Sequence, residues 1–152
     1  KEVLEIGVGT GRLAAQVAPG CARLTGIDIS PKTIARAVEN LAGHANIDLI
    51  CGDFLTYSFG KQFDAVYFSL TMMHFENKQE VISKVCALLN RDGIFCLSID
   101  KNQSEYIDME TRKVKIYSDT LDNITSLISS SAMTVVDVVE VENAYIIVSH
   151  KI

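Results

Sequence analysis

The sequence contains no tryptophan, two prolines and four cysteines among its 152 residues. The cysteines form no C-x-x-C pair, and no histidine lies at metal-ligand spacing from one of them, so neither a zinc site nor a disulfide framework is indicated. Cys51, Cys86 and Cys96 lie inside apolar runs, where cysteine packs as a small apolar residue. We therefore expect these three and Cys21 to be reduced thiols.

Long apolar runs and blocks of positive charge are absent as well. No run approaches the ~18–20 residues of a membrane-spanning helix, and no signal segment opens the chain, which favours a cytoplasmic protein without a membrane partner. The net charge is −5, and Lys and Arg are not clustered as a nucleic-acid surface requires, so no nucleic-acid partner is expected. The most basic segment, Arg112–Lys115, alternates like the solvated face of a strand.

What the sequence does contain is a glycine-rich segment near its start. The apolar residues Val3–Ile6 predict a short buried strand, glycines follow as Gly7, Gly9 and Gly11, and Arg12–Val17 has a helical pattern. Glycine allows positive φ and close approach of a ligand to the backbone, and a helix N-terminus adds free N–H groups. The segment is therefore typical of a turn that cradles a nucleotide-like ligand.

Strands and helices alternate over the next part of the chain. The expected strands are Arg23–Ile29, Ile47–Cys51, Phe63–Ser69 and Ile94–Ile99. The expected helices are Pro31–Leu41, with Ser30 as its N-cap, and Asn77–Leu89, followed by a turn at Asn90–Gly93. This alternation predicts right-handed crossovers and an α/β, doubly wound, mostly parallel sheet.

The last third of the sequence has a different pattern. Tyr106–Met109 and Lys113–Tyr117 predict a hairpin around Glu110-Thr111, and Asp119–Ser130 predicts a helix. Two strands, Thr134–Glu140 and Ala144–Ser149, then follow with a link too short for a crossover. They are therefore expected to be antiparallel neighbours. Since there is no linker or repeat, we expect residues 1–152 to form a single domain.

Five motifs in this order resemble those of class I S-adenosylmethionine-dependent methyltransferases. They are the loop Glu5–Gly11, the acidic strand end Gly26–Ser30, the segment Gly52–Phe54, the strand Phe63–Ser69, and the turn Leu88–Gly93, where Asn90 replaces a common proline. The resemblance implies a Rossmann-like sheet of seven strands in the order 3-2-1-4-5-7-6, with one antiparallel terminal strand. Family members usually have helices before the first strand, and these N-terminal helices are missing here.

The resemblance also implies S-adenosyl-L-methionine as the cofactor and S-adenosyl-L-homocysteine as the product. A carboxylate at Asp28 can accept hydrogen bonds from both ribose hydroxyls, and Asp53 is expected to reach the adenine amino group. Ile29 and Phe54 are expected to enclose the adenine ring. Glu5 is a carboxylate in an apolar strand, which is costly without a partner, so we expect it to face the ammonium of the cofactor. Gly7, Gly9, Gly11 and Ser69 complete the expected cofactor-binding set.

Structural alternatives exist for three of these residues. Asp28 is also placed to cap the helix that begins at Pro31, although Ser30 fulfils that role well. Asp53 follows a glycine and has the features of an ordinary turn residue. Glu5 has an alternative in an ion pair with Lys or Arg.

The reaction itself requires few side chains. Methyl transfer is an in-line displacement, so alignment of the reactants supplies much of the catalysis, and a base is needed only for a protonated acceptor. His74 follows the fourth strand and is the candidate base, because histidine titrates near neutral pH. The alternative is that His74 only packs at the start of the next helix. Tyr67, Tyr106 and Tyr117 are further candidates for the acceptor pocket.

The acceptor is expected to be a small molecule, with a protein side chain as the alternative. Methyltransferases that act on nucleic-acid bases carry an Asn/Asp-Pro-Pro-aromatic motif where this chain reads Ser69–Met72, and no ligand cluster for Mg²⁺ is present. A homodimer is a further expectation. A non-catalytic cofactor-binding subunit stays open as an alternative. An NAD-dependent Rossmann oxidoreductase is disfavoured, because its G-x-G-x-x-G fingerprint requires glycine where the chain has Arg12.

Overall fold

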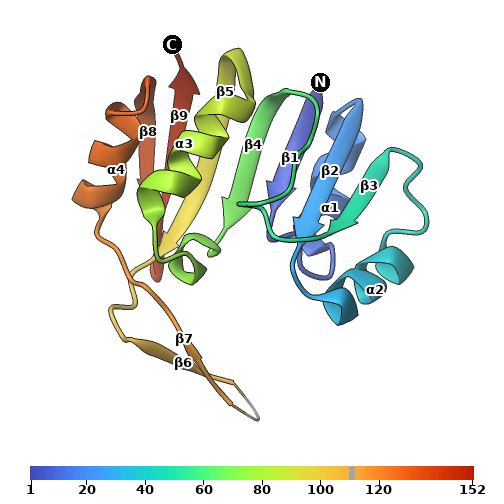
Figure 1. The fold of residues 1–152 in the computed structure, drawn as a ribbon, viewed down its shortest axis with the longest axis horizontal. Coiled ribbons are helices and arrows are strands. Elements are labelled where there is room, and N and C mark those ends of the chain that lie inside the picture. The colour runs from blue at the N-terminus through green and yellow to red at the C-terminus, as the bar shows by residue number, and fades with distance from the viewer. Residues whose placement is uncertain (110–111) are drawn as a thin grey trace.

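The computed structural model describes residues 1–109 and 112–152, so the predicted turn residues Glu110 and Thr111 lie outside the described residues. The chain forms a seven-stranded sheet in the order β3-β2-β1-β4-β5-β9-β8, flanked by helices (Figure 1). Strand β9 runs antiparallel to both of its neighbours, and the other pairs are parallel. Without the small hairpin, this order is 3-2-1-4-5-7-6, which confirms the predicted fold class.

The element bounds agree closely with the sequence pattern. The sheet contains β1 (Glu2–Ile6), β2 (Arg23–Asp28), β3 (Ile47–Cys51), β4 (Phe63–Ser69), β5 (Leu89–Asp100), β8 (Met133–Glu140) and β9 (Ala144–Lys151). The α-helices are α1 (Arg12–Val17), α2 (Pro31–Asn40), α3 (Lys78–Leu88) and α4 (Leu121–Ser129), and the 3-10 turns are η1 (Ala18–Gly20) and η2 (Met72–His74). Strands β6 (Tyr106–Asp108) and β7 (Lys113–Lys115) pair as a separate antiparallel hairpin. None of the described helices has the length and apolar character to cross a membrane.

Side-chain caps explain where three helices begin. Ser30, Asn77 and Thr120 each accept a hydrogen bond from the main-chain N–H three residues later, at the starts of α2, α3 and α4. Such a cap satisfies one of the donors that a helix start leaves free, and its loss typically costs about 1 kcal/mol. The caps also set the lengths of the loops that precede these helices.

Helices cover the two faces of the sheet unequally. Helices α3 and α4 pack against β5, β8 and β9 over the larger core, in which Phe63, Phe68 and Phe95 are fully buried. Helices α1 and α2 lie near β2 and β3, over a smaller core that contains Leu24 and Ala37. The parallel strands β1 to β5 end at the same edge of the sheet, and the β6–β7 hairpin projects beyond that edge (Figure 1).

The start of β5 differs from the sequence prediction. Residues 90–93 form part of β5 and not a free turn, because Leu89 already pairs with Phe63 while Ile94 pairs with Ala65. These four residues stand opposite the single residue Asp64, which makes the register irregular there. The side-chain amide of Asn90 donates to Asp64 Oδ1 at 3.0 Å. Asn90, which replaces the usual proline, therefore stabilises a bulge.

Gly26 allows the loop after β1 to lie directly on β2. A Cβ at this position would lie 2.7 Å from Cγ2 and 2.9 Å from Cβ of Val8, and 3.2 Å from a methyl group of Leu49. Contacts below 3.0 Å with a β-branched side chain require the backbone to move. The glycine loop therefore depends on the missing side chain in the neighbouring strand.

We predict that Gly26→Ala lowers the free energy of unfolding by about 1–3 kcal/mol through overpacking. Gly43→Ala is the matched control, because a Cβ there meets nothing within 4 Å. Urea denaturation followed by circular dichroism measures both. Equal unfolding midpoints for the two variants would contradict the close packing of Val8 on β2.

Candidate functional site

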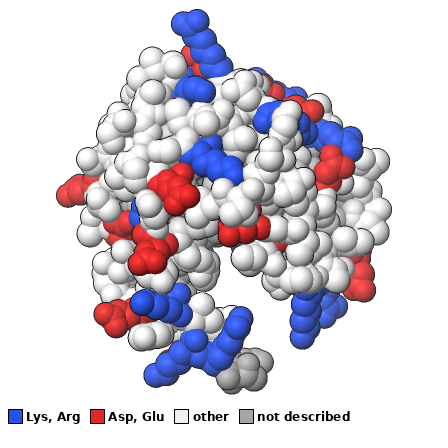
Figure 2. Space-filling view, viewed as in Figure 1, with Lys and Arg blue, Asp and Glu red and all other residues white. Residues whose placement is uncertain are grey.

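A cavity of about 940 Å³ opens at the edge where the parallel strands end. Its lining comes from the loops after β1, β2, β3 and β4 and from the β6–β7 hairpin. Figure 2 shows the molecule hollowed between the hairpin and the body of the sheet. Six of the residues predicted from sequence line this cavity: Gly7, Asp28, Ile29, Asp53, Phe54 and His74.

Asp28 ties two of these loops together at the end of β2. Its Oδ2 accepts a hydrogen bond from the Gly9 N–H at 3.0 Å, and its Oδ1 accepts one from the Ser30 N–H at 3.0 Å. Since Ser30 caps α2 with its own hydroxyl, Asp28 is not the cap of that helix. Each carboxylate oxygen has a second acceptor position, so both remain available to a ligand in the cavity.

The three loop glycines differ in what a side chain at each position would contact. All have positive φ. A Cβ on Gly7 would lie 2.7 Å from Thr71 Oγ1, and one on Gly11 would lie 2.6 Å from a methyl group of Leu41, so both are required by packing within the protein. A Cβ on Gly9 would meet nothing within 4 Å. Gly9 and Gly11 are not among the residues that line the cavity.

Glu5 precedes the lining residues Ile6 and Gly7 in the sequence but does not itself line the cavity. It is 3% exposed, and its Oε2 accepts a hydrogen bond of 2.7 Å from the hydroxyl of Tyr67 on β4. Burial raises the pKa of Glu5 to about 7, against the lowering effects of the Tyr67 hydrogen bond and of Arg12. Burial and the Glu5 carboxylate raise the pKa of Tyr67. Tyr67 is thus the partner of Glu5, in place of the Lys or Arg that the sequence left open.

The loop after β3 presents Asp53 and Phe54 to the cavity. Oδ1 of Asp53 accepts from the Leu55 N–H at 2.9 Å, as in an ordinary turn, while the side chain remains exposed. Phe54 is 4% exposed, whereas Ile29 on the opposite loop is 69% exposed. Lys84 of α3 fixes this loop by donating to the carbonyl oxygens of Phe54, at 2.5 Å, and of Tyr57, at 2.7 Å. No local sequence pattern indicates this role of a lysine.

His74 ends the η2 turn and lies exposed at the rim of the cavity. Its main-chain N–H donates to the Thr71 carbonyl at 3.0 Å. Desolvation, followed by the charge of Lys78, lowers the pKa of His74, while the charge of Asp28 opposes this effect. The imidazole is therefore mainly neutral at pH 7 and has a nitrogen free to accept a proton.

The hairpin supplies a wall of the cavity that sequence reasoning did not assign. The hairpin residues in the lining are Ile107, Met109, Arg112 and Val114. Arg112 therefore does more than form a solvated strand face. None of the predicted tyrosines Tyr67, Tyr106 and Tyr117 lines the cavity. Ser69 also lies outside it, and its hydroxyl accepts a hydrogen bond of 3.1 Å from that of Ser98.

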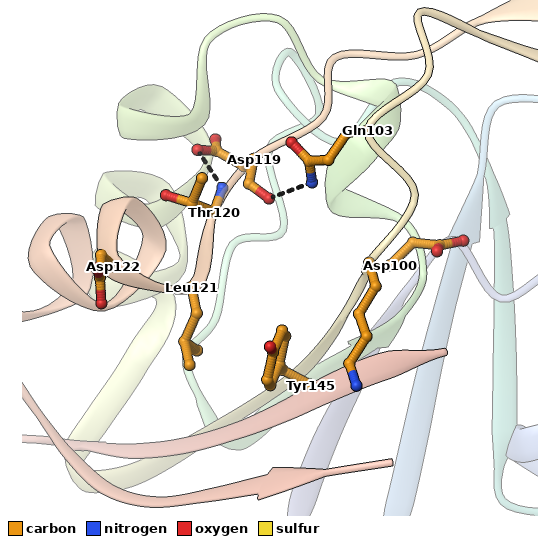
Figure 3. Close-up of a pocket in the computed structure, with 8 residues that line it drawn as sticks. Asp100, Gln103, Asp119, Thr120, Leu121, Asp122 and Tyr145 are labelled. Carbon is orange, nitrogen blue, oxygen red and sulfur yellow. Dashed lines mark hydrogen bonds between the residues drawn. The ribbon is translucent and has the colours of Figure 1, made fainter. Parts of the chain in front are cut away.

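A second, smaller cavity of about 430 Å³ shares Asp100 with the first (Figure 3). It lies beside the start of α4, where Gln103 donates to the Asp119 carbonyl at 3.3 Å. The Lys101 ammonium lies 4.9 Å from the centre of the Tyr145 ring and pairs with Glu140 at 2.7 Å. Lys101 and Gln103 in its lining are thus already engaged in contacts within the protein.

The fold and the cavity define an α/β protein with a doubly wound sheet and a cavity at the carboxyl edge, where folds of this class bind their ligands. The profile of a family described as "Methyltransferase domain" matches residues 3–93. This chain belongs to that methyltransferase domain family.

Similar proteins agree with this membership. Nodulation protein S of Sinorhizobium fredii is 28% identical over 104 residues, and the match covers 65% of this chain and 48% of that protein. The chain thus spans about half the length of this curated relative. The structure of the N-methyltransferase NodS from Bradyrhizobium japonicum, with S-adenosyl-L-homocysteine, has a TM-score of 0.80 at 20% identity, covering 99% of this chain and 78% of that one. The structure of the [4+2]-cyclase SpnF has a TM-score of 0.83 at 15% identity, and the match covers 99% of this chain and 75% of the cyclase chain.

The raised pKa of Glu5 predicts a specific pH dependence of stability. Between pH 4.5 and about 7 the folded protein keeps a proton on Glu5 that the unfolded chain releases, so the free energy of unfolding falls as pH rises through this window. The shift corresponds to about 3 kcal/mol. Glu5→Gln should remove this part of the pH dependence. The measurement is the difference between the variant and wild type in the free energy of unfolding by urea at pH 5, 6, 7 and 8.

Glu2→Gln is the control for this measurement, because Glu2 lies on the same strand and pairs with Lys61 at a partly exposed position. Its difference from wild type should stay nearly constant over the same pH range. A pH-independent difference for Glu5→Gln would mean that Glu5 is already ionised at pH 5 in the folded protein.

Proposed function

We propose that this protein is an S-adenosyl-L-methionine-dependent methyltransferase that transfers a methyl group to a small-molecule acceptor. The observation that carries the proposal is the common cavity of Asp28, Asp53 and His74, at the strand edge where ligands of such folds bind. The membership of the methyltransferase domain family supports it.

The residues present fit the cofactor. The two oxygens of Asp28 keep acceptor positions for the two ribose hydroxyls, and Ile29 and Phe54 offer apolar surfaces for the adenine ring. The exposed carboxylate of Asp53 would accept the adenine amino group. The glycine loop would hold the methionine part, with Glu5 supplying negative charge below it. Loss of a proton from Glu5 would then accompany binding of the ammonium group.

The protein's own part in the reaction would be alignment and proton removal. When bound, the cofactor supplies an electrophilic methyl group on a sulfonium. The hairpin wall and η2 would hold the acceptor in line with that methyl group, which is the main source of rate in such a displacement. A neutral His74 imidazole nitrogen would accept the acceptor's proton at pH 7.

The size and lining of the cavity support a small-molecule acceptor. Its volume lies within the ~300–1,000 Å³ of small-molecule sites. The hairpin contributes apolar side chains, Ile107, Met109 and Val114, together with the cation of Arg112. This wall favours an acceptor with an apolar body and at least one polar group.

Asp28→Asn should weaken binding of S-adenosyl-L-homocysteine by roughly 10- to 100-fold, because hydrogen bonds to a charged group contribute about 1.5–3 kcal/mol. Isothermal titration calorimetry measures the dissociation constant, with NAD as a second titrant that should not bind. Asp64→Asn is the matched control, since Asp64 also accepts from a main-chain N–H and a side chain but lies at the opposite edge of the sheet. Equal affinities of the two variants would refute the ribose role, and NAD binding would favour an oxidoreductase.

His74→Ala should reduce formation of S-adenosyl-L-homocysteine in an acceptor screen by roughly 10²–10⁴-fold while leaving cofactor affinity unchanged. His150→Ala on β9 is the control and should retain full turnover. Near-normal turnover of His74→Ala would remove the base role. Cofactor binding by wild type without turnover on any acceptor would favour the non-catalytic subunit.

A further inference from the structure

Lys78, the first residue of α3, is a buried cation that the proposed reaction does not use. It is 7% exposed, and its Nζ donates to the carbonyl oxygens of Met72 and Tyr117, both at 2.5 Å. Burial lowers the pKa of Lys78 to about 8, against the raising effect of Asp119. The ammonium is thus held by two main-chain groups from segments far apart in the sequence.

The position of Lys78 is energetically unfavourable in itself. A positive charge at a helix N-terminus opposes the helix dipole, and burying an ammonium group costs free energy unless its protons are well bonded. Asn77 already caps α3, so the helix start does not need the lysine. Any stabilisation by Lys78 must therefore come from its hydrogen bonds to the two carbonyl groups that it joins.

One of these carbonyl groups lies in η2, which lines the large cavity through Met73 and His74, and the other lies just beyond the hairpin that forms another wall. Met72 lies in η2, the turn that carries His74, and Tyr117 lies two residues after β7 of the hairpin. The Tyr117 N–H also donates to the Met73 carbonyl at 2.7 Å. At the hairpin's base, the buried Ile116 donates its N–H to the Glu105 carbonyl at 2.8 Å. The projecting hairpin of Figure 1 is therefore joined to η2 at its base.

We propose that Lys78 is a positioning residue that anchors the β6–β7 hairpin to the η2 turn and thereby sets the acceptor-side wall of the cavity. The acceptor part of this statement rests on the proposed function, whereas the anchoring does not. Lys78 fixes the distance between the hairpin residues that contact an acceptor and His74, which lies at the rim of the same cavity.

Two further lysines make the same kind of contact elsewhere and serve as matched controls. Lys84 donates to the carbonyls of Phe54 and Tyr57 on the adenine side of the cavity. Lys151 donates to the carbonyls of Cys86 and Leu89, at 2.8 and 2.9 Å, away from the cavity. Substitution by Met keeps the apolar stem in each case and removes only the ammonium group.

The experiment compares Lys78→Met, Lys84→Met and Lys151→Met by hydrogen exchange and by titration with S-adenosyl-L-homocysteine. Lys78→Met should raise exchange of the amides of Ile116 and Tyr117 roughly 10-fold or more while changing the dissociation constant less than about 3-fold. Lys84→Met should instead raise the dissociation constant of S-adenosyl-L-homocysteine and leave exchange of the Ile116 and Tyr117 amides unchanged. Lys151→Met should lower the unfolding midpoint without a selective effect on the hairpin.

Once the screen has identified an acceptor, Lys78→Met should raise its KM more than it lowers kcat, which a general loss of stability would not do. Unchanged exchange in Lys78→Met, or an equal increase in Lys151→Met, would overturn the anchoring. A lower kcat at unchanged KM would overturn the acceptor role. Failure of wild type to bind S-adenosyl-L-homocysteine would refute the proposed function and leave the exchange result intact.

Discussion

The site depends on the carboxylate of Asp28, which joins the loop after β1 to the loop after β2 through the N–H groups of Gly9 and Ser30. This contact is available only because the glycine loop descends onto β2, where Gly26 leaves room for Val8. Separate contacts, with Thr71 and with Leu41, exclude side chains at Gly7 and Gly11. One anionic group thus holds two loops and still has acceptor capacity toward the cavity. The residues that build the edge of the sheet are therefore also those that would recognise a ribose.

The electrostatics of the edge follow from burial more than from net charge. Burial raises the pKa of Glu5 to about 7 and lowers the pKa of His74, so a buried carboxyl and an imidazole near one cavity both tend toward the neutral form at pH 7. A cationic ligand would reverse this tendency at Glu5, because it favours the carboxylate, whereas desolvation, more than the charge of Lys78, lowers the pKa of His74. The two groups therefore suit different tasks, charge pairing and proton acceptance, within a single site.

Much of this organisation could be predicted from the sequence, because local patterns carry it. The period of apolar residues and the cap at Ser30 indicate the strands and helices, and parallel strands bring Asp28 and Asp53 to one edge. Contacts between distant segments could not be predicted. The partner of Glu5 is a tyrosine on β4, and the bulge at Asn90 depends on the register with Asp64. No local pattern distinguishes a lysine that binds two distant carbonyls from one that is solvated.

The residues proposed for cofactor recognition and those proposed for the acceptor side also differ in how well the family profile covers them. The family profile ends at residue 93, and the residues proposed to hold the cofactor all lie before that point. The hairpin wall, which includes Arg112 and Val114, lies after it. A cyclase with the same fold at 15% identity shows that the sheet alone does not determine the chemistry. In this chain, the hairpin contributes lining residues to the same cavity as the loop of Asp53 and Phe54. Under the proposed function, the hairpin residues that would contact an acceptor thus lie outside the part of the chain that the family profile covers.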